Sequence, residues 1–481
     1  MDISKKPGGL LGFRHVQYSL MIVATVLGYG MRTVLNVAIV AMVDEHPPKD
    51  RYYSVYPEWK PKKNLILSSF FWGYVCLQVG AGQLAKKYGT RLFLLGSILI
   101  PSVAGVLLPL AGAELGYIGV IICRIVQGLA QGALVPSIHA LLSEWAPVSE
   151  RAKWGGFVYA GQALGNVFAM PITGAIAATK VGWPLVFYLY GGIGLLWSIL
   201  WLSLGSDSPS KSKRISDTER KWIEASRVNI EEKSDVPTPW KAIFTSPPFL
   251  AILLAHCGQN WGFWTLLTEM PSFMREILKY KIDSNSFMSA LPYFVMWVLS
   301  FFMSPIADQL VERKIVSLRT SRKIFNTIGF VIPGVALLSL NIVDGHNKSA
   351  IIAILVIGVG MNAGHFCGFL VNHIDISPNH AGTLAAITNS TASVFSIFAP
   401  LAVDLIKHVT GSKEDDKQLW NIVFSIAGGV YLITAVIFII FASGDIQPWN
   451  GNNEISAIKD AKIEEKKRLG ILRKISTSMA A

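Results

Sequence analysis

Residues 92–113 have the sequence LFLLGSILIPSVAGVLLPLAGA, which contains no Asp, Glu, Lys or Arg. An α-helix rises about 1.5 Å per residue, so a stretch of this length crosses the roughly 30 Å hydrocarbon core of a bilayer. Its two prolines do not argue against this, because membrane helices tolerate proline where neighbouring groups satisfy the freed backbone. The stretch therefore predicts a membrane-spanning helix.

Similar stretches recur along the whole chain. Two of them, residues 15–43 and 115–143, are each interrupted by a single arginine, and the others contain no charged residue. The uncharged stretches are residues 64–85, 92–113, 154–179, 181–206, 242–268, 284–307, 324–343, 349–374, 376–403 and 418–444. The pattern predicts an all-α membrane protein with twelve spans.

Composition and charge agree with lipid as the solvent of this chain. Apolar residues make up 52% of the sequence and charged residues only 15%, against about 25% charged in a typical soluble protein. The formal charge of +12 does not indicate nucleic-acid binding, because Lys and Arg fall in short clusters between spans. The four cysteines all lie in apolar runs and predict neither a disulfide framework nor a zinc site.

The distribution of basic residues predicts the topology. With the N-terminus inside, 28 of the 43 Lys and Arg residues fall on the inner side, 13 fall on the outer side and two lie within spans. Inner loops carry the basic excess in membrane proteins, so we expect both termini in the cytoplasm.

The longest polar connection divides the spans into two sets of six. We expect an N-terminal bundle over residues 1–206, a cytoplasmic linker over 207–241, a C-terminal bundle over 242–444 and a basic cytoplasmic tail over 445–481. Ile215, Trp222 and Ile223 give part of the linker the apolar face of a short surface helix, although a solvated linker explains the same residues equally well.

Two arginines within spans are the sharpest chemical signal. Arg32 shares a helical face with Tyr29 and Asn36, and Arg124 shares one with Gln131. An arginine near the bilayer centre costs roughly 3 kcal/mol on insertion scales, so each needs a compensating role. Guanidinium groups match carboxylate or phosphate oxygens, which predicts an anion site, whereas pairing with a buried carboxylate is the structural alternative.

The second half offers polar residues that could complete this site. Gln259 and Asn260 lie on the seventh span, and His256 on that span and His365 on the tenth are candidates for a proton relay. An interhelical hydrogen bond is the ordinary alternative for any such side chain in a membrane. Asn347-Lys348-Ser349 is a glycosylation sequon in a loop expected outside, and the sequence contains no enzyme motif and no cofactor motif.

Several motifs carry a family resemblance over nearly the whole chain. They are Gly30-Met31-Arg32 with Asn36-Val37-Ala38-Ile39-Val40, Ser69-Phe70-Phe71-Trp72-Gly73-Tyr74, Arg124-Ile125-Val126-Gln127-Gly128 with Trp145-Ala146-Pro147, and Val371-Asn372-His373-Ile374-Asp375-Ile376. The chain resembles the solute carrier family 17 anion transporters of the major facilitator superfamily. The resemblance implies a fold of two pseudo-symmetric six-helix bundles, with Arg32 and Arg124 coordinating the anion and Tyr74 beside them.

Three positions depart from parts of that family. Gln131 stands where many proton-coupled members have glutamate, Gln259 stands where the glutamate-transporting branch has arginine, and Leu67 stands where that branch has histidine. The chain therefore resembles the phosphate and organic-anion branch most.

These observations predict a secondary active transporter of a small anion, phosphate or an organic carboxylate, coupled to Na⁺ or H⁺ by alternating access. An anion channel or a uniporter driven by membrane potential is one alternative, and a non-transporting ligand sensor is another. We expect a monomer with no nucleic-acid partner, in the plasma membrane or in a vesicular or lysosomal membrane.

Overall fold

The computed structural model describes residues 12–47, 50–227, 238–343 and 347–451, and within these ranges it contains helices and no strand. The first half contains α1 (Phe13–Met42), α2 (Lys63–Tyr88), α3 (Thr90–Gln131), α4 (Leu134–Trp145), α5 (Val148–Ala177) and α6 (Trp183–Leu204). The connection contains α7 (Asp217–Arg227) and α8 (Trp240–Phe244). The second half contains α9 (Pro247–Glu276), α10 (Ile282–Glu312), α11 (Leu318–Ser339), α12 (Lys348–Met361), α13 (Phe369–Ile376), α14 (Ala381–Thr410) and α15 (Lys417–Phe441).

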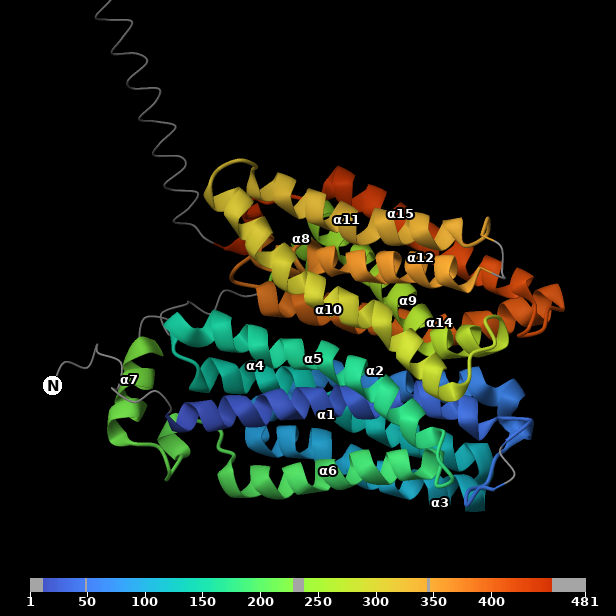
Figure 1. Ribbon diagram of the computed structural model, residues 1–481. Coiled ribbons are helices and arrows are strands. Elements are labelled where there is room, and N and C mark those ends of the chain that lie inside the picture. The colour runs from blue at the N-terminus through green and yellow to red at the C-terminus, as the bar shows by residue number, and fades with distance from the viewer. Residues whose placement is uncertain (1–11, 48–49, 228–237, 344–346, 452–481) are drawn as a thin grey trace, which may run out of the picture.

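Successive helices run in opposite directions and form two bundles that lie side by side (Figure 1). Helices α1 to α6 make one bundle and α9 to α15 make the other. Helix α7 lies at one end of the molecule, which we call the linker end. The segment between α1 and α2 lies at the opposite end, which we call the loop end.

Twelve crossings can be traced in the described part of the chain. Seven helical stretches are long and apolar enough to span a membrane, and one of them, Thr90–Trp145, extends over two crossings. It reverses at Gly116, where φ is +63°, a conformation that favours glycine, and Gly119 then packs on the carbonyl of Ala111. Helices α2, α5, α9 and α11 are also long enough but less apolar. The predicted all-α fold of twelve spans in two bundles is confirmed.

Four predicted spans differ in detail from the structure. The fourth crossing breaks between α3 and α4, and the tenth is interrupted by a 3-10 turn, Asn362–Phe366. The eleventh begins at Ala381 rather than at residue 376, since the segment before it contains Pro378, which disfavours helix at the residue before it. The seventh runs on past residue 268 to Glu276.

The bundles meet along two pairs of long helices, α2 with α14 and α5 with α10. Close approach is possible because Gly174 on α5 lies directly against Ser286 on α10. Polar contacts between the bundles include the Asn36 amide, which donates to the carbonyl oxygen of Leu267 at 3.3 Å. The Asn64 amide likewise donates to Asp404 at 2.8 Å. The structure is therefore joined across the bundles at the loop end.

Helix α7 shows that part of the linker packs against the first bundle. Arg14, at the start of α1, is 1% exposed and pairs with Glu219 of α7 at 2.7 Å and with Glu150 of α5 at 3.0 Å. Its guanidinium carbon also lies 5.0 Å from the ring centre of Trp222, and Ile223 is fully buried. The surface helix is thus present, while residues 228–237 of the linker and 452–481 of the tail lie outside the described residues.

Candidate functional site

Arg32 lies in a cage of aromatic rings between the two bundles. Its guanidinium carbon is 4.1 Å from the ring centre of Trp264 and 5.7 Å from that of Tyr29. The rings of three α2 residues lie at 4.6–4.8 Å: Phe70, Phe71 and Tyr74. The side chain is 6% exposed, and its Nε donates no hydrogen bond. Aromatic faces attract a cation but leave its N–H donors available for an anion.

Arg124 approaches the same place from α3. Its Nη2 donates to the carbonyl oxygen of Arg32 at 3.1 Å, and its Nη1 donates to Gln127 at 3.0 Å. Its guanidinium carbon lies 4.8 Å from the ring centre of Phe70, the ring that Arg32 also contacts. Both guanidinium groups therefore converge on one buried phenylalanine.

Neither arginine forms an ion pair with a carboxylate among the residues that the structure describes. Two buried positive charges without a counter-ion are costly in a low-dielectric interior. The cost falls when an anion with several oxygens accepts hydrogen bonds from both guanidinium groups. The arrangement is therefore suited to bind a small carboxylate or phosphate.

A close crossing of α2 and α3 brings these side chains together. A Cβ on Gly73 would lie 2.0 Å from the carbonyl oxygen of Ile125, and one on Gly128 would lie 1.9 Å from that of Phe70. Only glycine fits at both positions, because the obstacle in each case is backbone. Gly128 follows Arg124 by one turn, so the crossing sets the guanidinium of Arg124 against α2.

The remaining candidates of the first bundle separate into two groups. Tyr29 lies against Arg32, as the shared helical face predicts, and Tyr74 lies there too, as the family resemblance implies. Asn36 instead bonds to the backbone of α9, and Gln131 donates to the carbonyl oxygen of Gly28 at 3.0 Å. These two amides connect helices, so any contact with a substrate would use their remaining atoms.

One of the two amide candidates of the second bundle, Gln259, is also engaged with a neighbouring segment. Gln259 exchanges two hydrogen bonds with Asn362, at 2.8 and 2.9 Å. Asn260, half-buried, lies one turn before Trp264 on α9 and so shares the face that reaches Arg32.

The two proton-relay candidates both contact the ring of Phe369, with ring centres 5.1 Å away for His256 and 5.8 Å away for His365. His256 contacts the hydroxyl of Thr388 at 3.1 Å, and His373 contacts the same hydroxyl at 2.8 Å. His365 contacts the carbonyl oxygen of Asn362 at 2.6 Å and stacks on Phe369. The structure does not join His256 to His365 by a hydrogen bond in the part of the chain that it describes.

The comparison with known proteins identifies the family. Residues 21–400 match the model of the Major Facilitator Superfamily. The chain belongs to this superfamily. It is 40% identical over 446 residues to a protein of Drosophila ananassae named putative inorganic phosphate cotransporter, covering 89% of this chain and 92% of that protein. It is 36% identical to human sialin, covering 88% of each.

Solved structures agree on the fold of this superfamily member. A D-xylose-proton symporter superposes with a TM-score of 0.68 at 15% identity, covering 89% of this chain and 98% of that one. The relatives confirm the resemblance to solute carrier family 17. The chain is therefore a multi-pass membrane transporter related to anion transporters and is not an enzyme.

Sequence reasoning named Tyr29 and Tyr74 but missed Phe70 and Phe71 as parts of the site in this transporter. Phe70 and Phe71 belong to a motif that carried the resemblance, but nothing in an apolar run distinguishes a ring that faces an arginine from one that faces lipid. Trp264 stands at helical spacing from Asn260, and this spacing predicts that it shares the polar face of the seventh span.

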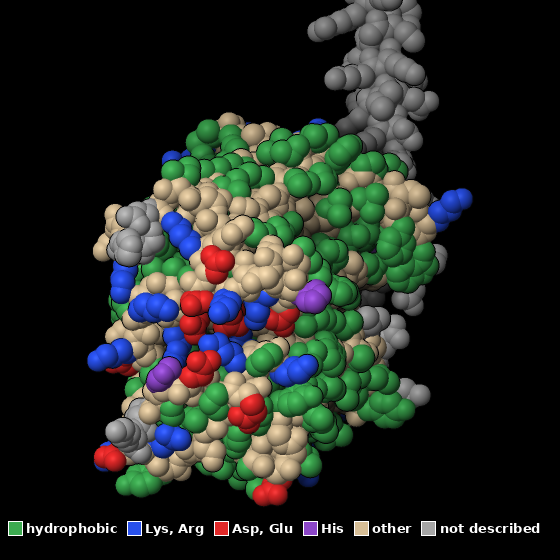
Figure 2. Space-filling model, turned by 90° about the vertical axis from the view of Figure 1, so that its right-hand side faces the viewer, with side chains coloured by type: hydrophobic (Ala, Val, Ile, Leu, Met, Phe, Trp, Pro, Cys, Tyr) green, Lys and Arg blue, Asp and Glu red, His purple; other side chains and the backbone are tan. Residues whose placement is uncertain are grey.

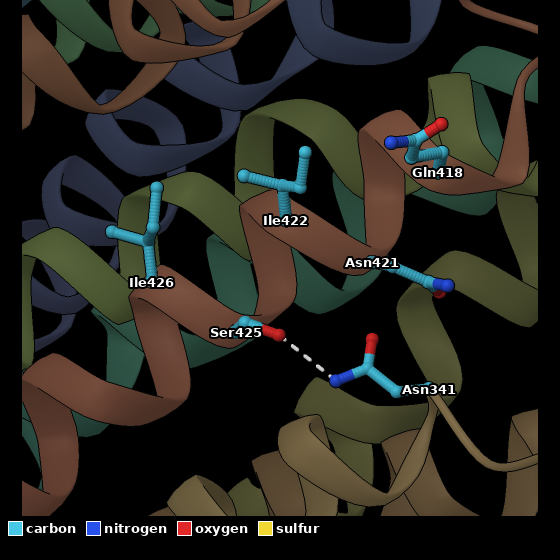
Figure 3. A pocket seen from close by; sticks show the side chains of 6 residues that line it. All are labelled: Asn341, Gln418, Asn421, Ile422, Ser425 and Ile426. Carbon is cyan, nitrogen blue, oxygen red and sulfur yellow. Dashed lines mark hydrogen bonds between the residues drawn. The ribbon is translucent and has the colours of Figure 1, made fainter. Parts of the chain in front are cut away.

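Two hollows lie away from the arginines. A hollow of about 370 Å³ lies between α15 and the residues after α11, where Asn341 donates to Ser425 at 2.8 Å, and its lining contains no charged side chain (Figure 3). The other, of about 280 Å³, opens at the loop end. Figure 2 looks onto that end and shows basic and acidic side chains gathered in the middle of the face. This second hollow is lined by charged residues that include Lys63 and Glu414.

The predicted sequon is exposed at the loop end. The Asn347 side chain accepts a hydrogen bond from the backbone N–H of Ala350 at 3.1 Å and so caps α12. We expect a glycan on Asn347 if the loop end faces the outside. Ser349→Ala should abolish the shift in gel mobility on glycosidase treatment while keeping this cap, whose loss would cost about 1 kcal/mol.

A second sequon supplies the control for this measurement. Asn389 lies within α14, so Asn389→Gln should leave the gel shift unchanged. A shift that persists in Ser349→Ala would contradict the assignment of the glycan to Asn347.

Proposed function

We propose that this chain is a secondary active transporter of a small anion, inorganic phosphate or an organic carboxylate, driven by a Na⁺ or H⁺ gradient. The observation that carries the proposal is the convergence of Arg32 and Arg124, without a carboxylate partner, on Phe70. The first relative's name favours phosphate as the first anion to examine.

Alternating access is supported by where the site lies. Arg32 belongs to the first bundle and Trp264 to the second, so an anion held by Arg32 would lie at the interface along which the bundles move. Substrate-binding residues placed at such an interface allow binding energy to change with the relative position of the bundles. Tyr29, Tyr74, Asn36, Gln131, Gln259 and Asn260 complete the proposed site, with His256 and His365 as proposed proton-relay residues.

The proposed orientation in the membrane follows the distribution of basic residues, and the other features below are separate parts of the proposal. We place both termini in the cytoplasm, the bundle limits at residues 206 and 242, and the working unit as a monomer. The membrane is the plasma membrane or a vesicular or lysosomal one.

Counterflow in proteoliposomes tests the proposal. Vesicles loaded with unlabelled anion should accumulate the labelled anion transiently, first with phosphate and then with sialate and dicarboxylates. Varying Na⁺ and pH gradients independently identifies the driving ion. Large unitary currents would instead support the anion channel, accumulation that follows only the membrane potential would support the uniporter, and binding without flux would support the sensor.

A further inference from the structure

Glu269 is a fully buried carboxylate at the interface between the bundles. It lies on α9, is 0% exposed, and neither of its oxygens accepts a hydrogen bond. Its nearest cation is Lys63 at the start of α2, whose Nζ lies 3.7 Å away. A buried carboxylate without hydrogen bonds strongly favours its neutral, protonated form unless a cation is dedicated to it.

Lys63 is not dedicated to Glu269. Its Nζ lies closer to Glu414, at 3.1 Å, and donates to the hydroxyl of Ser272 at 3.0 Å. Lys407 on α14 pairs with the same Glu414 at 3.1 Å and with Asp404 at 3.2 Å. Burial acts to raise the pKa of Glu414, but Lys63 and Lys407 outweigh it and leave this pKa below its ordinary value.

The charges around Glu269 therefore do not balance. The ionisable groups that act on it are Lys63 from α2, Asp404 and Lys407 from α14, and Glu414 from the loop before α15. Asp44, after α1, pairs with Arg275 of α9 and is not among these groups. Two cations face three carboxylates, and Glu269 is the carboxylate with the weakest partner. One proton would balance the set.

The same residues join the two bundles. Lys63 and Asn64 belong to the first bundle, whereas Glu269, Ser272 and Asp404 belong to the second. Opening of the loop end must separate Lys63 from Glu269 and Ser272, and it would admit water to Glu269. A hydrated carboxylate ionises readily, so the proton is favoured in the closed arrangement and disfavoured in the open one.

We propose that Glu269 is a proton-binding site that controls opening of the loop end: the proton is bound when the bundles meet there and released when they part. The inference rests on the proposed alternation of access but on neither the identity of the anion nor the driving ion. A proton fits better than a metal ion, since the described part of the chain holds no group of three or more His, Cys, Asp or Glu residues able to bind one.

Thiol labelling of purified protein in detergent tests this directly. Ser272 lines the hollow at the loop end but is only 3% exposed, so Ser272→Cys, in a chain whose cysteines 76, 123, 257 and 367 are replaced by alanine, places a thiol that should be labelled faster when the loop end opens. Because a proton-linked equilibrium changes by up to about tenfold per pH unit, the labelling rate should rise about tenfold between about pH 5.5 and 8 beyond the intrinsic reactivity of the thiol.

Two variants set the reference for that rate. Glu269→Gln imitates the protonated side chain, so the Ser272→Cys chain that carries it should be labelled slowly, with only the intrinsic pH dependence of a thiol. The ratio of the two rates then cancels the reactivity of the thiol itself. Glu276→Gln, on the same helix and lining the hollow, should leave the pH response intact.

Glu414→Gln gives an independent measurement. It leaves two cations facing two carboxylates, so Lys63 is freed to pair with Glu269 and should hold it ionised to lower pH. The rise in labelling should therefore move to lower pH. This shift decides the question even if Glu269→Gln fails to give a monodisperse protein.

A ratio that does not change with pH, or an unmoved rise in Glu414→Gln, would overturn the proposal. Labelling needs no substrate, so this outcome is separate from that of the transport assay. If the anion panel shows no flux while labelling depends on Glu269, the proposed function fails and the proton site stands.

Discussion

Replacing Arg32 by methionine should abolish anion transport without lowering the stability of the protein. Truncating one partner of a buried, hydrogen-bonded charge pair typically costs about 2–5 kcal/mol, which is roughly thirtyfold to several-thousandfold in transport below saturation. Stability should hold or rise, because Arg32 has no carboxylate to leave unpaired and a buried charge replaced by an apolar side chain is often neutral or stabilising.

The two readouts together separate a binding residue from a structural one. Counterflow measures transport, and the thermal midpoint by size-exclusion chromatography measures stability. Arg32→Lys should recover part of the flux, since it keeps the charge but loses the planar fork. Arg220→Ala, on α7, removes a partly exposed arginine that pairs with a neighbour on its own helix, Asp217, so it is the control and should change neither. A variant of Arg32 that transports normally would remove it from the site.

The arginines of the site could be predicted because charge is rare in a span. Arg32 and Arg124 each stand alone in an apolar run, and burial cost makes such residues conspicuous in the sequence itself. Their convergence on Phe70 could not be predicted, because it depends on how closely α2 crosses α3. The partners of Gln131 and Gln259 were equally hidden, since an amide can bond to any helix that its packing brings near.

The predicted ends of the spans were least accurate where a charged residue was assumed to end a span. The seventh span was ended before Glu269 because a carboxylate is costly in lipid, yet α9 continues to Glu276. Glu269 lies between helices rather than in lipid, with Lys63 opposite it. Charge excludes a residue from the lipid-facing surface but not from a protein interface, and the sequence alone does not distinguish the two.

Gly128→Ala should prevent correct folding of the first bundle. The new Cβ would lie 1.9 Å from the carbonyl oxygen of Phe70 and 2.9 Å from the backbone nitrogen of Tyr74, so α2 itself must move. Overpacking that side chains can absorb typically costs about 1–3 kcal/mol, and backbone displacement should exceed this range. The thermal midpoint should fall sharply, or the protein should elute as an aggregate.

Gly192→Ala is the control for Gly128→Ala, and we expect it not to destabilise the protein. Gly192 also lies within a helix, α6, but its Cβ would meet no atom within 4 Å. Alanine exceeds glycine in helix propensity by about 1 kcal/mol, so this variant should be as stable as the parent or more so. If both substitutions behaved alike, the close crossing would not be what holds α2 against α3. If only Gly128→Ala fails, the crossing that sets Arg124 against Phe70 is also what holds the bundle together, which ties the geometry of the site to the packing of the fold.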